Sequence, residues 1–327
     1  MVVSTGLLRA IAAETGVAID VLASPANAPV ARGESFIGVV HVLYRFKPWR
    51  WPATVARLRA ARYDAVVDCM VTAPSVTTLL LMLAVGARER IGVAGRGNDD
   101  AFTITVPPRP DARHIIDHLS ALAAAFGIDV ATADFTPALT LSATERARAV
   151  AIWDAVAPRG DDTPRLLVNI SAGVTARHWP DDRFVEVLQL VRRDHPQVQT
   201  LIIGGPEDQE RVLAIGNAAG VATARTPALR DALALVGTAD VVLSADTGIS
   251  HAAVAFRRHS VVLHRPRSAV VWGLYGAPGA IIVSEGVTLT ELPVAPVWRA
   301  LDQFLAGDSQ PPAADAARTR SREGAST

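Results

Sequence analysis

The sequence predicts an α/β protein of two domains, each with helices packed on a mostly parallel sheet. Half of the residues are hydrophobic and only 5% are aromatic, a mixture that favours helices packed on buried parallel strands. Strand-like apolar runs alternate with segments of helical spacing along most of the chain, as parallel connections require. Because 327 residues exceed one ordinary domain, we expect two.

Charge and cysteine content limit the classes of function that the chain can have. Lys+Arg and Asp+Glu balance at 32 each, so the chain has no basic field to attract nucleic acid, and local groups must hold any anionic ligand. The single cysteine, Cys69, excludes an internal disulfide and is expected to be a small buried hydrophobe. Residues 1–6 do not have the pattern of a signal peptide. The longest apolar run, 75–87, has about 13 residues, whereas a membrane-spanning helix needs roughly 20. We expect a cytoplasmic protein, and a peripheral contact with a membrane stays open.

Residues 1–155 are expected to form the first domain. The loop 44–51 is rich in Trp and Arg and is either a solvated turn with packed rings or a contact for an anionic acceptor or a membrane surface. His114 and His118 have metal-ligand spacing, but without a third ligand we expect no metal site. An apolar helix at 74–85 should be covered on nearly all faces. The expected elements are helix 6–15, strands 17–23 and 39–43, helix 53–62, strand 63–70, helix 74–85, strands 90–93 and 102–106, and helix 114–126.

Between residues 129 and 164 the pattern changes to turns around one capped helix, which places a domain boundary near residue 155. Residues 156–306 form the second domain, and 307–327, rich in Ala, Pro, Ser, Gly and charge, are expected to be a disordered tail. The elements expected in the second domain are strand 165–170, helix 182–193, strand 199–203, helix 207–218, short strand 221–222, helix 229–236, strand 241–243, strand 260–263 and helix 296–305.

Three strand ends in the second domain carry small or flexible residues. They read Ser171-Ala172-Gly173, Gly204-Gly205-Pro206 and Asp246-Thr247-Gly248. Successive strands of a parallel sheet point the same way, so all three ends should meet at one carboxyl edge, where ligands bind. A single glycine turn is weak evidence, but three along one edge favour a nucleotide site.

The last of these ends is the most informative, because an apolar run of strand type stops at Asp246 and an Ala-rich helix follows from Ile249. Gly248 lets the backbone approach a ligand, the first N–H groups of the helix suit phosphate, and Asp246 can accept hydrogen bonds from sugar hydroxyls. Alternatively, Asp246 caps the helix, and His251 is a hydrogen-bonded core histidine. Trp179 is expected to pack rather than touch substrate. The pattern indicates a nucleotide-sugar site.

These motifs resemble the ADP-heptose heptosyltransferases of lipopolysaccharide synthesis, glycosyltransferase family nine. The resemblance covers about residues 1–305, and it implies a GT-B fold of two Rossmann-like doubly wound domains facing a cleft, the first on the acceptor side and the second holding the nucleotide sugar. The matching segments are Asp246-Thr247-Gly248 with Ser250-His251, Arg177-His178-Trp179-Pro180, Gly204-Gly205-Pro206-Glu207, and, more weakly, Thr5–Ala10, Arg90-Ile91-Gly92 and the helix from His114.

The resemblance also implies a role for each matching residue. Arg177 stands where the family usually has a lysine that pairs with the diphosphate. An arginine keeps the positive charge of that lysine but differs in the geometry of its hydrogen-bond donors. The implied donor site consists of Asp246 for the sugar hydroxyls, Thr247 and Gly248 for the diphosphate, His251 in support of that turn, Arg177 for charge, Glu207 for the nucleotide ribose, and Ser171 and Thr175 in a loop that closes on phosphate oxygens.

The implied reaction is an inverting transfer of a sugar, heptose in the family, from an ADP-sugar to a lipopolysaccharide-core, lipid-linked or other glycan acceptor, with no metal or other cofactor. The family's general base is an aspartate in a Gly-Asp turn after the first strand, just before the segment that Val2–Thr5 resembles. We therefore expect the first strand and the base to lie before Met1, and we assign neither Asp20, Asp64 nor Asp68 to that role.

A second departure from the family follows residues 260–263, where His264-Arg265-Pro266 replaces a Gly-Pro-Thr type of turn. With the base missing, a non-catalytic or degenerate GT-B protein that binds a nucleotide or glycan partner stays open as an alternative. A dehydrogenase is disfavoured, because no Gly-x-Gly-x-x-Gly follows a strand.

Overall fold

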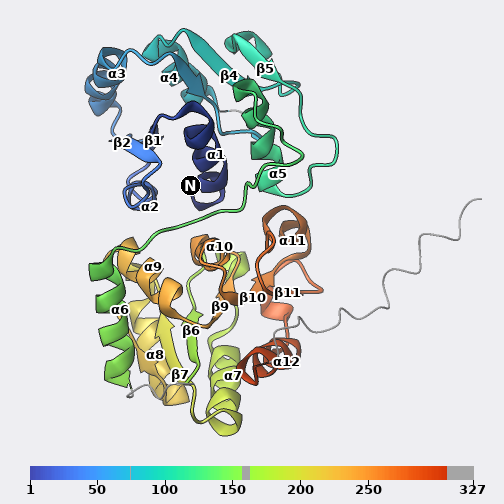
Figure 1. The fold of residues 1–327 in the computed structure, drawn as a ribbon. Coiled ribbons are helices and arrows are strands. Elements are labelled where there is room, and N and C mark those ends of the chain that lie inside the picture. Colours follow the sequence, from blue (N-terminus) through green and yellow to red (C-terminus); the bar gives the residue numbers. More distant parts are fainter. Residues whose placement is uncertain (74, 157–162, 308–327) are drawn as a thin grey trace, which may run out of the picture.

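The structure is a computed structural model that describes residues 1–73, 75–156 and 163–307, arranged as two α/β halves that face each other (Figure 1). The two facing α/β halves agree with the α/β fold class that the sequence predicted. The first half contains η1 (Val2–Ser4), α1 (Thr5–Thr15), β1 (Ile19–Ala23), α2 (Ala28–Ala31), β2 (Ile37–Val42), η2 (Pro48–Arg50), α3 (Trp51–Ala60), β3 (Ala65–Val67), α4 (Val76–Val85), β4 (Glu89–Val93), η3 (Asp99–Ala101), β5 (Ile104–Val106), α5 (Ile115–Ser120) and η4 (Ala121–Phe126).

The second half is built on one sheet of six parallel strands in the order β11-β10-β9-β6-β7-β8. It consists of α6 (Ala143–Val156), β6 (Arg165–Asn169), η5 (Thr175–Arg177), α7 (Asp181–Asp194), β7 (Gln199–Ile203), η6 (Pro206–Asp208), α8 (Gln209–Ala219), β8 (Ala222–Thr223), α9 (Leu229–Thr238), β9 (Val241–Ala245), α10 (Gly248–Ala255), β10 (His259–His264), α11 (Pro266–Trp272), β11 (Gly279–Val283), η7 (Leu289–Glu291) and α12 (Val294–Leu305).

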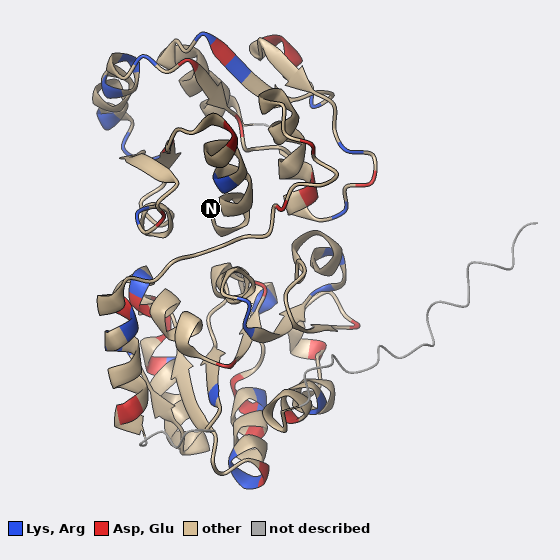
Figure 2. Cartoon of the chain, viewed as in Figure 1, with Lys and Arg blue, Asp and Glu red and all other residues tan. Residues whose placement is uncertain are grey.

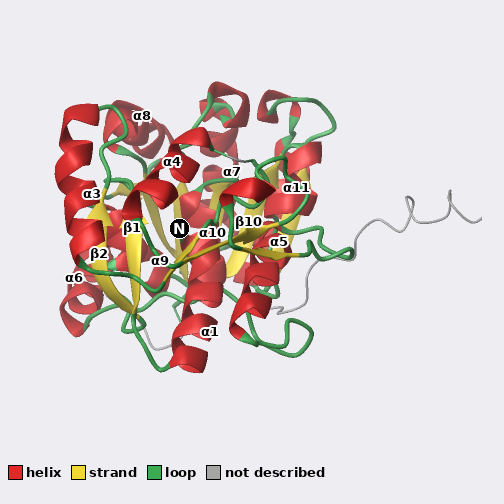
Figure 3. Cartoon of the chain, turned by 90° about the horizontal axis from the view of Figure 1, so that it is seen from above, coloured by secondary structure: helices red, strands yellow, loops and turns green. Residues whose placement is uncertain are grey.

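Helices cover both faces of this sheet, which explains why its central strands are apolar throughout. Every residue of β6, β7 and β9 is buried. One core cluster joins them to α7, α8 and α12, and another joins them to α6, α9 and α10. Seen from above, the helices surround the strands (Figure 3). Because all six strands run in parallel, their carboxyl ends share one edge.

The first half is less complete, because its five strands form two separate parallel sheets, β1-β2 and β3-β4-β5. Helix α1 packs against both, since Leu7 and Ile11 share a cluster with Ile19 of β1 and with Ala65 and Val67 of β3. No hydrogen-bonded strand joins the two sheets within the described residues.

Helix α6 lies with the second sheet rather than the first (Figure 1). The Trp153 ring is fully buried in the core of the second half, and its Nε1 donates to Thr238 Oγ1 at 3.1 Å. The chain therefore passes between the halves before residue 143, whereas the sequence placed the boundary near residue 155. Most of the expected tail, residues 308–327, lies outside the described residues.

Several local expectations differ from the structure. Helix α4 is not covered on nearly all faces, because Val76, Leu80 and Leu83 are exposed. Cys69 is exposed rather than buried, since it follows β3 instead of lying within it. The sequence pattern did not indicate α2, α11 or β11. It predicted one helix over residues 114–126, where α5 passes into a 3₁₀ segment.

Candidate functional site

The site is centred on the turn between β9 and α10. Thr247 is the N-cap of α10, and its Oγ1 accepts from the N–H of Ile249 at 3.3 Å. Ser250 Oγ accepts in return from the N–H of Thr247 at 3.2 Å, which completes a capping box. Thr247, and not Asp246, therefore caps the helix, so the Asp246 carboxylate is left for another role.

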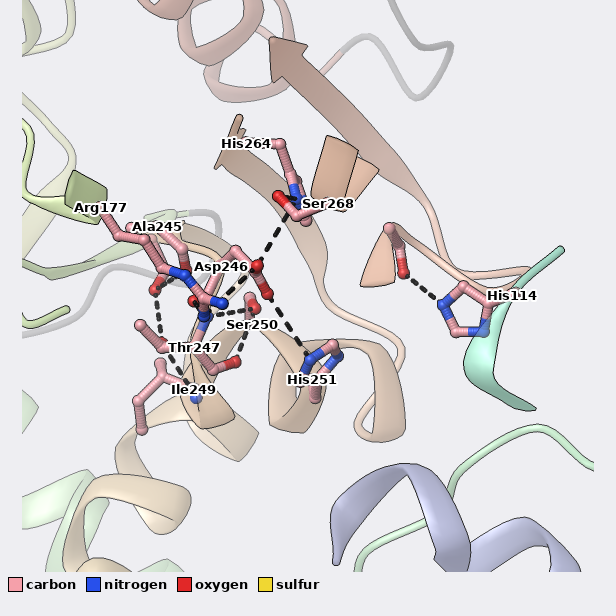
Figure 4. Close-up of polar contacts among 12 residues, drawn as sticks. His114, Arg177, Ala245, Asp246, Thr247, Ile249, Ser250, His251, His264 and Ser268 are labelled. Carbon is pink, nitrogen blue, oxygen red and sulfur yellow. Dashed lines mark hydrogen bonds and ion pairs between the residues drawn. The ribbon is translucent and has the colours of Figure 1, made fainter. Parts of the chain in front are cut away.

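Asp246 is buried at 3% exposure and contacts one cation, Arg177 (Figure 4). Nη1 of Arg177 donates to the main-chain oxygen of Asp246 at 3.0 Å and lies 3.4 Å from its Oδ2. Among the described residues, Asp246 Oδ2 accepts no hydrogen bond. Buried carboxylate oxygens normally have partners, so this oxygen is suited to accept a donor from a bound ligand.

Two histidines lie beside the same carboxylate. His251 Nε2 is 3.8 Å from Asp246 Oδ1, and His264 Nδ1 is 3.9 Å from Oδ2. Burial lowers the pKa of His251 to about 4, although the Asp246 charge opposes this shift. Burial, with a smaller contribution from the Arg177 charge, also lowers the pKa of His264 to about 4. Both rings are neutral at neutral pH, so the charge near the carboxylate comes from Arg177.

Short hydrogen bonds hold the three strand ends together. Asn169 Nδ2, at the end of β6, donates to Ser244 Oγ of β9 at 3.0 Å. Ser171 Oγ donates to Asp208 Oδ2 at 2.6 Å and accepts from the N–H of Gly205 at 2.6 Å, which links the ends of β6 and β7. The predicted turns therefore lie side by side at one edge, as the parallel sheet requires.

These turns line a cleft of about 520 Å³ between the two halves, within the size range of small-molecule sites. The second half contributes Ser171, Glu207, Thr247, Gly248 and His251, and residues 1–3 line the other side. A side-chain carbon added at Gly248 would meet nothing within 4 Å, so the first turn of α10 faces open space. Backbone N–H groups at such a helix start favour an anion.

The predicted donor residues differ in how they relate to this cleft. Asp246, Arg177 and Thr175 do not line it. Asp246 directly precedes the lining residue Thr247 and contacts Arg177, and Thr175 lies exposed on η5. Glu207 is the only carboxylate among the described residues that line it. Trp179 packs, as expected: it is 1% exposed, and its Nε1 donates to the oxygen of Leu292 at 2.8 Å.

The lining residues that the sequence did not indicate include Asn169, Thr226 and Trp272. The Trp272 ring lies 5.7 Å from the His251 ring, although 21 residues separate them along the chain. Asn169 is the last residue of an apolar strand, and this position is the one signal that could have identified it. Trp272 ends an apolar helical run and carries no motif.

Two hydrogen bonds join the halves beside the cleft. His114 Nε2 is 3.1 Å from the oxygen of Gly273, and Tyr275 Oη donates to Asp117 Oδ1 at 3.0 Å. His114 Nδ1 also caps α5 by accepting from the N–H of Ile116, so the ring has structural partners at both nitrogens. Within the described part of the chain, no group of three His, Cys, Asp or Glu residues is placed to hold a metal ion.

A second cavity, of about 670 Å³, lies against residues 44–51, which we name the basic aromatic loop. The Trp49 ring is 70% exposed and the Phe46 ring 87%, so neither ring is packed. The Arg50 guanidinium lies 5.0 Å from the centre of the Tyr44 ring. Figure 2 shows Lys and Arg, without Asp or Glu, on the adjoining helix α3. No helix among the described residues is long and apolar enough to span a bilayer.

Comparison with known proteins agrees with this arrangement. Residues 52–291 match the model of glycosyltransferase family 9 (heptosyltransferase). A family 9 glycosyltransferase from Veillonella parvula superposes with a TM-score of 0.80 at 18% identity, over 94% of this chain and 93% of that one. E. coli ADP-heptose heptosyltransferase II superposes with a TM-score of 0.76 at 19% identity, over 94% and 96%.

E. coli heptosyltransferase WaaC, solved with ADP, superposes with a TM-score of 0.70 at 18% identity, over 93% of this chain and 96% of that one. No curated protein sequence matches the chain. At these identities the structures show a shared fold, while the family model covers 240 of the 327 residues. The chain belongs to glycosyltransferase family 9, the heptosyltransferase family.

Proposed function

We propose that the cleft binds an ADP-sugar, ADP-heptose, and that the protein transfers the heptose with inversion to a glycan acceptor of the lipopolysaccharide-core type. Asp246 accepts hydrogen bonds from the sugar hydroxyls, and Arg177 and the first turn of α10 hold the diphosphate. Glu207 lies on the ribose side, beside Gly205. In this proposal Ser171 and Thr175 form the rim around the phosphates, and no metal takes part.

The observation that carries this proposal is the Oδ2 of buried Asp246, which accepts no hydrogen bond from the described residues and lies beside the Arg177 cation and an open helix start. A carboxylate suits hydroxyl donors, while a guanidinium and free N–H groups suit phosphates. The sugar and the diphosphate of a nucleotide sugar therefore match adjacent parts of the carboxyl edge of the sheet. E. coli WaaC, which has the same fold, was solved with ADP and with ADP-2-deoxy-2-fluoro heptose, and this supports an adenine nucleotide donor.

Inverting transfer needs a general base for the acceptor hydroxyl and positive charge or dipoles for the leaving diphosphate. Arg177 and α10 supply the second requirement. For the first, Glu207 is assigned to ribose, and His251, with a pKa of about 4, is a weak base. No residue of the described chain is assigned as the general base in this proposal.

The acceptor side is assigned to the first half. The basic aromatic loop combines exposed rings with Arg45, Lys47 and Arg50, a composition that suits a phosphorylated glycan or an anionic membrane surface. We propose that a lipid-linked acceptor brings this loop to the inner membrane from the cytoplasmic side, as a peripheral contact.

Transfer is tested with ADP-heptose and a heptose-deficient lipopolysaccharide core, by measuring acceptor-dependent release of ADP. The parent chain is compared with its Asp246→Ala variant. We expect release by the parent chain and loss of release in the variant. If the parent chain releases no ADP although it binds ADP tightly, the transferase proposal is wrong.

A non-catalytic role as a nucleotide or glycan binder is the second candidate. It is favoured because Glu207 is the one carboxylate among the described residues that line the cleft, and Glu207 is already assigned to the ribose rather than to the general base. Calorimetric titration of ADP, UDP and GDP distinguishes a selective site from a general anion site. We expect ADP to bind most tightly; equal affinities for the three nucleotides would contradict the assigned donor.

A further inference from the structure

We propose that Trp272 contacts the sugar of the bound donor, and that His114 and Asp117 of the first half hold it in place. Trp272 is the last residue of α11, and residues 271–275, which we name the docking segment, pack against the first half. This inference rests on the proposed function, because it concerns the sugar end of the same cleft. It adds one contact residue and two positioning residues to that cleft.

The order of the strands indicates which end of the cleft Trp272 occupies. Along the carboxyl edge of the sheet, β10, β9, β6 and β7 follow one another. Glu207, assigned to the ribose, follows β7, whereas Thr247 and Gly248, assigned to the diphosphate, follow β9. The diphosphate of a nucleotide sugar lies between the ribose and the sugar, so the sugar extends from β9 toward β10. Helix α11 follows β10, and Trp272 at its end lines the cleft.

The surroundings of the Trp272 ring suit a sugar. The ring lies 5.7 Å from the His251 ring, and His251 Nε2 lies 3.8 Å from Oδ1 of Asp246, the carboxylate assigned to the sugar hydroxyls. The indole N–H groups of Trp153 and Trp179 donate to protein oxygens, whereas that of Trp272 donates to no described residue. Trp272 therefore offers a ligand both an apolar ring face and a hydrogen-bond donor.

The docking segment packs on the core of the first half. Val271, Trp272 and Tyr275 are partly buried against a cluster that includes Leu7 of α1 and Ile115 of α5. Figure 1 shows α11 facing α5 across the boundary between the two halves. Because Trp272 packs on the first half and also lines the cleft, its position in the cleft depends on how the docking segment sits on α5.

Two residues at the start of α5 fix that position. His114 Nδ1 accepts from the N–H of Ile116, so Nε2 carries the proton of the neutral ring and donates to the oxygen of Gly273 at 3.1 Å (Figure 4). Asp117 Oδ2 accepts from the N–H of His114, and its Oδ1 accepts from Tyr275 Oη at 3.0 Å. Burial and the Asp117 charge raise the pKa of Tyr275 to about 12, so its hydroxyl keeps the donated proton. The capping box of α5 therefore also holds the docking segment.

The sugar contact is tested by calorimetric titration of ADP-heptose and ADP into the parent chain, Trp272→Leu, Trp272→Phe and Val270→Ser. We expect Trp272→Leu, which keeps apolar packing but loses the ring, to bind ADP-heptose about tenfold more weakly and ADP less than about twofold more weakly. Trp272→Phe should retain most of the affinity for ADP-heptose. Val270 is exposed on the same helix, so Val270→Ser is the matched control and should bind both ligands like the parent chain.

The positioning role is tested with His114→Asn and Tyr275→Phe. Asparagine is a good N-cap, so His114→Asn keeps the cap of α5, but its shorter side chain loses the bond to Gly273. Tyr275→Phe removes only the hydroxyl that donates to Asp117. We expect each change to weaken binding of ADP-heptose about three- to tenfold in the parent chain, and to weaken it no further in Trp272→Leu. Additive losses in the double variants would contradict positioning through Trp272.

The outcomes separate this inference from the proposed function. A parent chain that does not bind ADP-heptose would contradict both. If the parent binds ADP-heptose and Trp272→Leu binds it equally well, only the sugar contact is wrong, and an equal loss of ADP and ADP-heptose would remove Trp272 from the sugar end. Thermal unfolding shows that each variant is folded at the temperature of the titration. Trp272→Met, which fills more of the space of the ring, replaces Trp272→Leu if that variant does not fold.

Discussion

The Arg177 guanidinium lies 3.4 Å from the Asp246 carboxylate and donates to the main-chain oxygen of the same residue at 3.0 Å. Asp246 therefore positions the cation that faces the start of α10. Replacing Arg177 with Ala removes a charge-assisted partner of the diphosphate, which is worth about 1.5–3 kcal/mol, and should weaken ADP binding about 10- to 100-fold. Calorimetry with ADP tests this, and Arg177→Lys, which keeps the charge, should retain part of the affinity. Equal binding by the Ala variant would remove Arg177 from the phosphate site.

Gly248 offers a test that leaves the fold intact. A side-chain carbon at this position meets nothing within 4 Å, so Gly248→Val should fold normally. The added side chain would nevertheless occupy the space in which phosphate approaches the backbone, and we expect ADP binding to fall at least tenfold. An unchanged melting temperature with lost binding supports the assignment; full binding by the variant would place the phosphates elsewhere.

The sequence predicted the meeting of the three turns at one sheet edge better than it predicted the elements of the first half. Asp246, Thr247 and Gly248 stand out because strand, turn and helix follow one another without interruption, and parallel strands bring the other two turns to the same edge. Helix α6 was assigned to the wrong half, because the capping residues that mark its start do not tell which sheet buries Trp153. Trp272 is close to His251 only through tertiary packing, which no local pattern encodes.

The pH dependence of stability should reflect His251 and His264. Their pKa values of about 4 lie below the 6.5 of an unfolded histidine, so the unfolded state binds more protons between these limits. The contribution of the two rings to the free energy of unfolding is therefore fully present above about pH 6.5. It is lost as the pH falls toward 4, by up to about 1.4 kcal/mol per pH unit for each ring. Urea unfolding at pH 5 and 7 checks this.

In those experiments His264→Gln should show a smaller loss between pH 7 and pH 5 than the parent chain. His118→Gln, on α5, is the matched control and should behave like the parent. If His264→Gln loses as much stability as the parent on acidification, His264 is not one of the groups responsible.

The buried Trp153 side chain connects α6 to the second half. Trp153→Ala should lower the free energy of unfolding by about 3–5 kcal/mol, because it leaves a cavity and removes the hydrogen bond to Thr238 Oγ1. Trp49→Ala, at an exposed ring, should change it by less than about 0.5 kcal/mol. Thermal and urea unfolding of both variants compare the two positions, and a similar small effect at Trp153 would contradict the packing of α6.

Membrane contact by the basic aromatic loop predicts binding to vesicles that contain an anionic lipid. Binding should be weak for neutral vesicles and should fall with salt, because each basic residue near an anionic surface contributes about 1 kcal/mol. Phe46→Ser with Trp49→Ser should reduce binding about tenfold, whereas Leu213→Ser, at an exposed position on α8, should not. Cosedimentation measures all three proteins, and equal binding by the loop variant would exclude this loop as the contact.

Calorimetric titration of ADP-heptose and of ADP into the parent chain and Asp246→Ala tests the central claim most directly. Asp246 is assigned to the sugar hydroxyls, so we predict that the variant loses about 10- to 100-fold in affinity for ADP-heptose and less for ADP. An Asp246→Ala variant that binds ADP-heptose as tightly as the parent chain would contradict the donor site.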